Sequence, residues 1–283
     1  MIMLNNNLHI FIIAAETGSL TETAKKLYIS QPAVSQAIKK LEEELNVKLF
    51  IRSKRSSLIL TDVGRETLTL ANQMYELENR LYQRAYEENQ MMKGIVRIAA
   101  VPLATSLILS RVMPVFQKQF PDVRIELFES NPLSVKNMVL EYKADIGIST
   151  SPYLGLEHKV LMKDRMVSID RDRSRTVDLT EAVPDLILCR VAHDSIAEQL
   201  KGRSIDLSHS LIVEAASTQL NLIANGNGTG VISELMLSSI PNSLVIGKVK
   251  PEINMEISLI AHDFSQLSVA AREMTEMILE REY

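Results

Sequence analysis

Residues 24–50 constrain the fold more than any other stretch, because they combine a tight turn with a capped amphipathic helix. Ser30 suits an N-cap, and Pro32 follows in the first turn, where a missing backbone N–H costs little. An apolar stripe at helical spacing, which we expect to be buried, comprises Val34, Ile38, Leu41 and Leu45. The segment therefore predicts a helix that packs on one side and exposes the other.

The exposed side of this helix carries groups that can reach DNA bases and phosphates: Gln31, Ser35, Gln36, Lys39 and Lys40. Only its last turn is acidic, with Glu42, Glu43 and Glu44. A helix that is polar at its start, basic in its middle and acidic at its end suits entry into a DNA groove by its N-terminal end. Taken alone, the pattern fits an ordinary amphipathic surface helix equally well.

The flanking sequence favours the DNA-reading interpretation. An upstream helix ends near Thr17, and Ser19 then offers an N-cap with Glu22 as its capping-box partner for a short helix to Leu27. Downstream, residues 49–52 and 58–60 alternate like two short strands around a polar, basic tip at 53–57. Three helices and a basic hairpin form a winged helix-turn-helix. The side chains placed to meet the DNA backbone or the minor groove are Arg52, Lys54 and Arg55.

The run FIIAAETGSLTETAKKLYISQPAVSQAIKKLEEELNVKLFIRSKRSSLILTDVG resembles the DNA-binding half of LysR-type transcriptional regulators. The resemblance extends without a gap from about Leu4 to Gly64, and its combination of GSLTETAKKL, SQPAVS, IKKLEEEL and LTDVG is far more specific than one short motif. It implies an effector-responsive regulator that reads inverted-repeat half-sites on double-stranded DNA as a homodimer or homotetramer. RNA polymerase is a further candidate partner.

Composition agrees with this class. The chain has 283 residues, 46% of them hydrophobic, which is enough for about two domains. It contains neither an apolar run of ~18 residues nor a signal-peptide pattern, and Cys189 is its single cysteine, so we expect a soluble cytoplasmic protein without disulfides. Residues 1–61 hold eight Lys or Arg and five Glu, a net charge of +3, whereas the whole chain carries −4. This modest positive charge predicts that DNA affinity depends on two readers acting together.

Residues 62–91 predict one long helix, roughly 43 Å in length at ~1.5 Å per residue. Apolar residues recur at alternating spacings of four and three, as in a coiled-coil seam: Val63, Thr67, Leu70, Met74, Leu77 and Leu81. We interpret the seam as a dimerisation surface, because the short reader domain, residues 1–61, offers little core against which such a helix could pack. The alternative is a helix that packs on its own chain.

Residues 92–283 alternate strands and helices in a βαβαβ pattern typical of an open parallel sheet. IVRIAAV, LILSRVMPVFQKQFPDVRIELFE and KADIGIS are similar to the effector domain of the same family, which itself resembles periplasmic binding proteins. The resemblance implies two α/β lobes joined by two crossover strands, with a ligand cleft between them. We place lobe I at about 92–163 and 262–283, and lobe II at about 164–261. The predicted fold is thus an α+β reader followed by an α/β effector domain.

In open α/β sheets, ligands bind beyond the C-terminal ends of the strands, beside helix N-termini. This rule selects as candidate effector contacts Pro102, Leu103, Thr105, Asn131, Thr150, Ser195, Ser217 and Thr218. For each of them an ordinary helix cap is an equally good reading. Relatives that bind small carboxylates usually carry Ser or Thr at the position of Leu103, so this chain favours either a less polar effector or a clamp moved to Thr105.

Catalytic patterns are missing from the sequence, and we expect no enzyme, no metal and no cofactor apart from the effector. The five histidines are scattered, and no GxSxG or P-loop occurs. The glycine-rich segment 225–230 follows a predicted helix and lacks the P-loop lysine, so it predicts a turn. Two alternatives to the effector-gated regulator stay open: a solute-binding protein or enzyme built on residues 93–283, and a redox regulator acting through Cys189, for which a buried structural thiol is the simpler reading.

Overall fold

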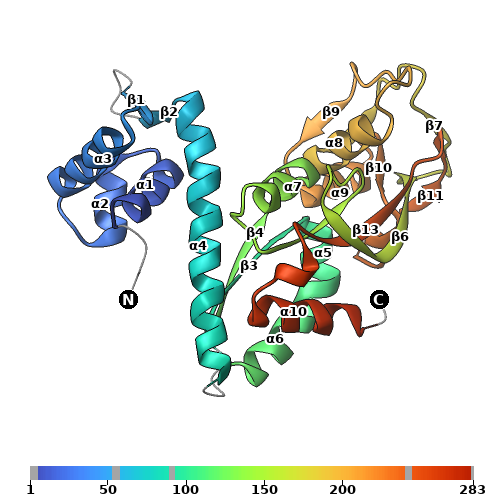
Figure 1. Ribbon diagram of the computed structural model, residues 1–283. Helices are drawn as coiled ribbons and strands as arrows, with labels where there is room; N and C mark the ends of the chain where they lie inside the picture. Colours follow the sequence, from blue (N-terminus) through green and yellow to red (C-terminus); the bar gives the residue numbers. More distant parts are fainter. Residues whose placement is uncertain (1–5, 53–57, 89–92, 240–243, 282–283) are drawn as a thin grey trace.

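The computed structural model describes residues 6–52, 58–88, 93–239 and 244–281. Three parts follow one another along the chain: a small N-terminal domain, the long helix α4 (Asp62–Glu88), and a larger α/β body. Figure 1 shows α4 standing between the two folded parts, with the N-terminal domain packed along one side of it and the α/β body along the other.

The N-terminal domain contains α1 (Asn6–Thr17), α2 (Leu20–Leu27), α3 (Gln31–Leu45) and the antiparallel pair β1 (Phe50–Arg52) and β2 (Leu58–Leu60). Both predicted caps are confirmed, because the hydroxyls of Ser19 and Ser30 accept hydrogen bonds from the N–H groups of Glu22 and Ala33. The core holds most of the predicted α3 stripe: Val34, Ile38 and Leu41. Leu45, the fourth member of that stripe, is 47% exposed, so its predicted burial was wrong. The helix ends there in a left-handed cap at Asn46, which leaves the last apolar side chain beyond the reach of the core.

Glu42 corrects a second expectation about α3. It is buried, and its carboxylate accepts hydrogen bonds from the backbone N–H groups of Leu49 and Phe50 and from Lys48 Nζ, at 2.9, 3.3 and 2.6 Å. Burial acts to raise the pKa of Glu42, but these hydrogen bonds together lower it below its ordinary value. Glu42 therefore fastens α3 to the wing strand β1, and only Glu43 and Glu44 form the acidic surface end of the helix.

α4 begins against the wing. The N–H of Gly64 bonds to the Thr61 hydroxyl, and a Cβ at Gly64 would lie 2.2 Å from the backbone oxygen of Leu49, so the helix can approach this closely only with glycine there. One face of α4, with Leu68 and Ala71, is buried in the core of the N-terminal domain. Further along, α4 contacts β3 (Gly94–Ala100) and α10 (Val269–Leu279) of the α/β body.

The α/β body is built on a nine-stranded sheet with the order β4-β3-β5-β13-β6-β10-β8-β9, and β11 also pairs with β6. Its first half comprises β4 (Val123–Glu129), β3, β5 (Ile146–Thr150) and β13 (Asn254–Ala261), and its second half comprises β10 (Thr229–Ser233), β8 (Leu186–Cys189), β9 (Leu211–Val213) and β11 (Val245–Gly247). The long strand β6 (Glu157–Asp170) belongs to both halves, because it pairs first with β13 and then with β10. A separate pair joins β7 (Val177–Asp178) and β12 (Val249–Lys250) in parallel.

Helices cover both halves of the sheet. A continuous helical stretch, α5 (Pro102–Ala104), a π-helical turn at Thr105–Leu109 and α6 (Ser110–Gln119), packs with α7 (Pro132–Leu140) and α10 around the core of the first half. α8 (Arg190–Gln199), α9 (Ala216–Ala224) and the 3-10 turn at Glu234–Ser239 follow strands of the second half, which has separate buried clusters. Residues 225–228 of the glycine-rich segment form the predicted turn between α9 and β10, while Thr229 and Gly230 already belong to β10.

Candidate DNA interface and effector cleft

The outer face of α3 gathers the predicted DNA-contacting side chains. Ser35 is half-buried. Six others are exposed: Ser30, Gln31, Pro32, Gln36, Lys39 and Lys40. Residues four apart lie on the same side of a helix, so Gln31 and Ser35 line up with Lys39, and Gln36 lines up with Lys40. Of the predicted wing contacts, Arg52 ends strand β1, but its side chain, like the whole of Lys54 and Arg55, lies outside the described residues.

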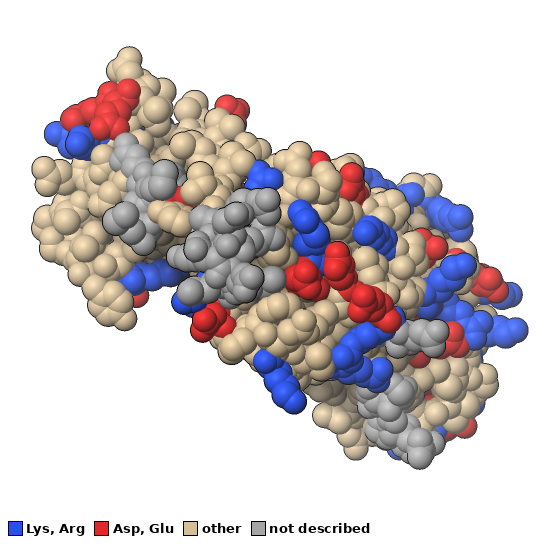
Figure 2. Space-filling model, turned by 60° about the horizontal axis from the view of Figure 1, so that its bottom comes forward, with Lys and Arg blue, Asp and Glu red and all other residues tan. Residues whose placement is uncertain are grey.

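The two lysines of this face are held only by weak surface ion pairs. Lys39 Nζ lies 3.4 Å from Glu43 and Lys40 Nζ lies 4.0 Å from Glu44, one helical turn on, and all four side chains are well exposed. Exposed pairs of this kind contribute about 0–1 kcal/mol, so DNA phosphates can replace the glutamates at little cost. Figure 2 shows one face of the molecule on which Lys and Arg alternate with Asp and Glu over the α/β body, without a broad surface of one sign.

A second exposed surface runs along α4. Five of the six residues of the predicted seam are 44–60% exposed: Val63, Leu70, Met74, Leu77 and Leu81. The opposite faces of the helix are covered by the N-terminal domain and the α/β body, so this apolar row is the side of α4 that remains open. Thr67, the sixth residue, is half-buried, and its hydroxyl donates to the backbone oxygen of Val63.

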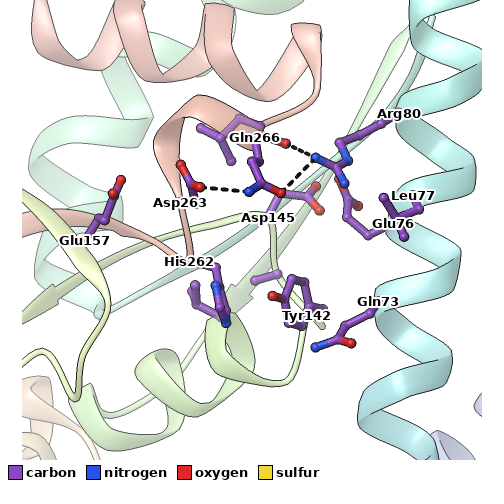
Figure 3. A pocket seen from close by; sticks show the side chains of 13 residues that line it. Gln73, Glu76, Leu77, Arg80, Tyr142, Asp145, Glu157, His262, Asp263 and Gln266 are labelled. Atoms are coloured by element: carbon purple, nitrogen blue, oxygen red, sulfur yellow. Dashed lines mark hydrogen bonds between the residues drawn. The ribbon is translucent and has the colours of Figure 1, made fainter.

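A hollow of about 500 Å³ lies between α4 and the α/β body, with Glu76 and Arg80 on the side of α4 and Asp145 and Gln266 on the side of the body (Figure 3). Arg97 of β3 places Nη2 2.6 Å from Glu76 of α4 and 3.0 Å from Asp145, and the Arg97 N–H donates to the same aspartate. One turn after Glu76 on α4, Arg80 donates to the backbone oxygen of Gln266 at 2.7 Å. These contacts tie the helix to the body at both its sheet and its C-terminal segment.

Glu76 is the member of this cluster whose negative charge is disfavoured by its surroundings. Burial raises its pKa well above the ordinary value, and the neighbouring carboxylate of Asp145 raises it further, against the opposing effect of Arg97 and Arg80. One guanidinium thus compensates two carboxylates at the joint between α4 and the body. This makes the joint sensitive to small shifts of either side, because a buried charge is costly once its partner moves away.

The cleft between the two halves of the sheet is a cavity of about 420 Å³, within the ~300–1,000 Å³ usual for small-molecule sites. Segments that follow the C-terminal ends of β3, β5, β8, β9 and β10 all reach it, and the crossover strands β6 and β13 form its floor. The rule that ligands bind beyond strand ends therefore locates the same cleft from both halves of the sheet.

Four of the eight predicted effector contacts line this cleft: Pro102, Leu103, Thr150 and Ser195. The other four are not among its lining residues. Asn131 caps α7 by accepting from the Ser134 N–H, and Thr105 begins the π-helical segment, in which the next residue, Ser106, lines the cleft instead. Ser217 and Thr218 are exposed one residue beyond the segment 214–216 that reaches the cleft, because α9 already begins at Ala216.

Sequence reasoning missed the floor of the cleft. Asp164 of β6 is only 7% exposed there, beside Met166 of the same strand and Met255 of β13. Its Oδ1 accepts from the N–H groups of Arg165 and Leu235, at 2.8 and 3.3 Å, while Oδ2 makes no hydrogen bond. These residues lie within strands, so a rule about strand ends passes over them. The one available signal was an aspartate in the middle of the strand sequence LMKDRMVSID, between two methionines.

The two halves also touch through a polar contact at the side of the cleft. Lys136 of α7 is fully buried and donates to Glu198 of α8 at 2.9 Å and to the Thr150 backbone oxygen at 3.3 Å. Gln199 donates to the backbone oxygen of Ser151 at 2.6 Å. These contacts hold the halves in their present separation.

Cys189 lines the cleft, but its surroundings do not activate it. The thiol is buried at the end of β8, and burial raises its pKa, which disfavours the reactive thiolate. Within the described ranges, no cluster of three or more His, Cys, Asp or Glu side chains could hold a metal ion. No described helix has the length and apolar character needed to cross a membrane.

A winged helix-turn-helix, linked by a long helix to a two-lobed body with a ligand-sized cleft, defines the class of ligand-responsive DNA-binding regulators. The comparisons with known proteins agree. Residues 5–65 match the family of bacterial regulatory helix-turn-helix proteins of the lysR type, and residues 89–282 match the LysR substrate binding domain. The chain belongs to the LysR family of transcriptional regulators, with a DNA-binding helix-turn-helix and an effector-binding domain, which confirms the prediction from its sequence.

Individual relatives cover nearly the whole chain. The uncharacterized regulator YoaU of Bacillus subtilis is 38% identical, with 98% of each chain covered, and YvbU of the same organism is 28% identical over 96% of this chain and 97% of its own. Among solved structures, a full-length OxyR variant from Pseudomonas aeruginosa superimposes with a TM-score of 0.68 at 18% identity, covering 97% of this chain and 95% of that one. Full-length CbnR in complex with its target DNA gives 0.59 at 19% identity, covering 96% and 98%. These structural likenesses establish the fold.

Proposed function

We propose that this regulator reads an inverted-repeat operator as a dimer and that a small molecule in the cleft between its lobes controls the reading. The observation that carries the proposal is the polar outer face of α3, which is exposed at the N-terminal end of a capped helix. Gln31, Ser35 and Gln36 contact base edges, where a glutamine amide can pair with adenine. Ser30, Lys39, Lys40 and the wing residues contact phosphate or the minor groove, and Pro32 fixes the start of the helix.

Pairing occurs through the exposed apolar row of α4. Its residues follow the spacing of a coiled-coil seam, and burying them between two copies removes apolar surface from water. A two-fold pair of α4 helices places two N-terminal domains symmetrically, so the operator half-sites are related by inversion. Further assembly into tetramers and contact with RNA polymerase would follow on the DNA, in the cytoplasm.

The effector acts by favouring one arrangement of the two lobes over another. The cleft is formed by segments of both lobes, so a bound molecule contacts both at once. A change in lobe separation reaches α4 through β3 and Arg97, which bonds directly to Glu76. The dimer then alters the spacing of its DNA readers and hence the bend of the operator.

A gel-shift assay with promoter-sized fragments tests this function. The full-length protein should retard fragments that carry its operator, and retardation should weaken steeply with added salt because phosphate contacts release counterions. A solute-binding protein or enzyme would retard none of them. The redox alternative is tested by Cys189→Ser, which should leave the response to oxidant unchanged because the thiol is buried and its pKa is raised.

A further inference from the structure

The charged residues that line the cleft between the lobes are all acidic. Among the described residues that line it there are two carboxylates, Asp164 and Glu214, and no lysine, arginine or histidine. Glu214 lies at the rim, with its side chain 81% exposed, and pairs with Arg190 at 3.2 Å. The carboxylate of Asp164, deep in the cleft, is the negative charge that remains without a cation.

Among the residues that the structure describes, none of opposite charge pairs with Asp164. The neighbouring guanidinium of Arg165 is exposed and forms a bidentate pair with Glu234, so it is engaged elsewhere. Burial raises the pKa of Asp164, and the charge of Glu234 raises it further, while the hydroxyl of Ser233 and the two backbone N–H groups oppose this. Ser233 approaches the carboxylate, but no well-formed hydrogen bond joins its hydroxyl to Oδ2. A buried anion of this kind is costly unless a partner arrives.

Asp164 is not the only polar group lining the cleft that lacks a hydrogen-bond partner among the described residues. Thr150, on the first lobe, is only 6% exposed, and its buried hydroxyl makes no hydrogen bond. Native proteins satisfy most buried polar atoms, so unpaired groups that share one cavity indicate a missing ligand. Most of the other lining residues are apolar, among them Leu103, Met166 and Met255, and methionine side chains adapt readily to a ligand.

We propose that the effector is a compact apolar molecule bearing a protonated amine, which pairs with Asp164 Oδ2 at the floor of the cleft. This inference rests on the proposed function, because it assigns the chemical class of the molecule that occupies the effector site. A carboxylate effector is disfavoured, since none of the described residues that line the cleft is a cation and Lys136 at its side is already paired with Glu198, so an anion would lie near Asp164 without a partner.

Matched small molecules provide the test. Thermal unfolding of the full-length protein is measured with 2-phenylethylamine, 2-phenylethanol or phenylacetate, and with hexylamine, hexanol or hexanoate, each at about 10 mM so that weak binding registers. Either amine should raise the Tm of the wild type more than its alcohol does, and neither acid should raise it. In Asp164→Asn the advantage of the amine over the alcohol should vanish, corresponding to an affinity loss of at least about tenfold.

Asp122→Asn is the matched control, because Asp122 is exposed on the surface of the first lobe and does not line the cleft. It should keep the full response to amines. The inference is overturned if the acids stabilise the wild type as well as the amines, if Asp164→Asn keeps its amine response, or if neither amine stabilises the wild type. Gel shifts on the same preparations separate this from the proposed function. If the protein retards DNA but its Tm does not respond to amines, only the proposed effector class is overturned. If its Tm responds to amines but it retards no DNA, the proposed regulatory role is overturned.

Discussion

The exposed row on α4 gives the most direct quantitative prediction. Leu70 and Leu81 are 60% and 54% exposed, so about half of each side chain is still available for burial in a dimer. Full burial of a leucine contributes about 1.5–3 kcal/mol, so each of these side chains should contribute ~1 kcal/mol on pairing. Two positions in two copies make four side chains. Replacing both leucines by alanine should therefore weaken the dimer by about 4 kcal/mol, a factor of about 10³ in Kd.

Analytical ultracentrifugation of the full-length double variant over a dilution series measures this change. Leu211→Ala is the matched control, because Leu211 is 52% exposed on β9 at the far edge of the sheet. It should dimerise like the wild type. The reasoning is refuted if the double variant keeps the Kd of the wild type while remaining folded, or if Leu211→Ala weakens the dimer to the same extent.

Three further predictions concern buried charge and DNA reading. Glu42→Gln should destabilise the N-terminal domain by about 1–3 kcal/mol in urea unfolding at neutral pH. The difference between the variant and the wild type should shrink as the pH falls through the lowered pKa of Glu42, below 4.5, because the protonated wild type loses the same stabilisation. Glu76→Gln should raise the Tm at neutral pH, because it removes the cost of burying the Glu76 carboxylate and its repulsion with Asp145. The wild type should approach the variant as the pH falls from the raised pKa of Glu76 towards 4.5, and a constant difference would contradict this reading. In fluorescence anisotropy, Gln31→Ala should relax operator specificity by about 1–3 kcal/mol, whereas Lys39→Ala should weaken all sequences alike and flatten the salt dependence; equal losses on operator and scrambled DNA for both variants would refute this division.

Local signals explain why much of the N-terminal fold could be predicted. Ser19 and Ser30 cap helices within three residues of themselves, and the alternation at 58–60 needs only its own sequence to indicate a strand. The exposed seam on α4 was readable for the same reason, since its repeat lies within one helix. Glu42 could not be interpreted in this way, because its partners, the N–H groups of Leu49 and Phe50, meet it only after the chain turns into the wing.

The effector cleft was predicted in part. The strand-end rule found Pro102, Leu103, Thr150 and Ser195, because Thr150 ends a strand and the others follow strands that could be recognised from the sequence. The strand-end rule missed the floor of the cleft, since Asp164 faces the cleft from the middle of a strand that passes between two halves of a sheet. Which side of such a strand meets the cleft depends on pairing with β13, nearly a hundred residues later, and no local pattern encodes that.

DNase I footprinting of the full-length protein, on fragments selected from its own genome by gel shift, tests the central claim most directly. The account predicts two protected half-sites related by inversion and separated by whole turns of about 10 base pairs, with protection that shifts when an amine effector is added. Protection of a single asymmetric site, or none against an excess of scrambled DNA, would contradict a paired, effector-gated reader.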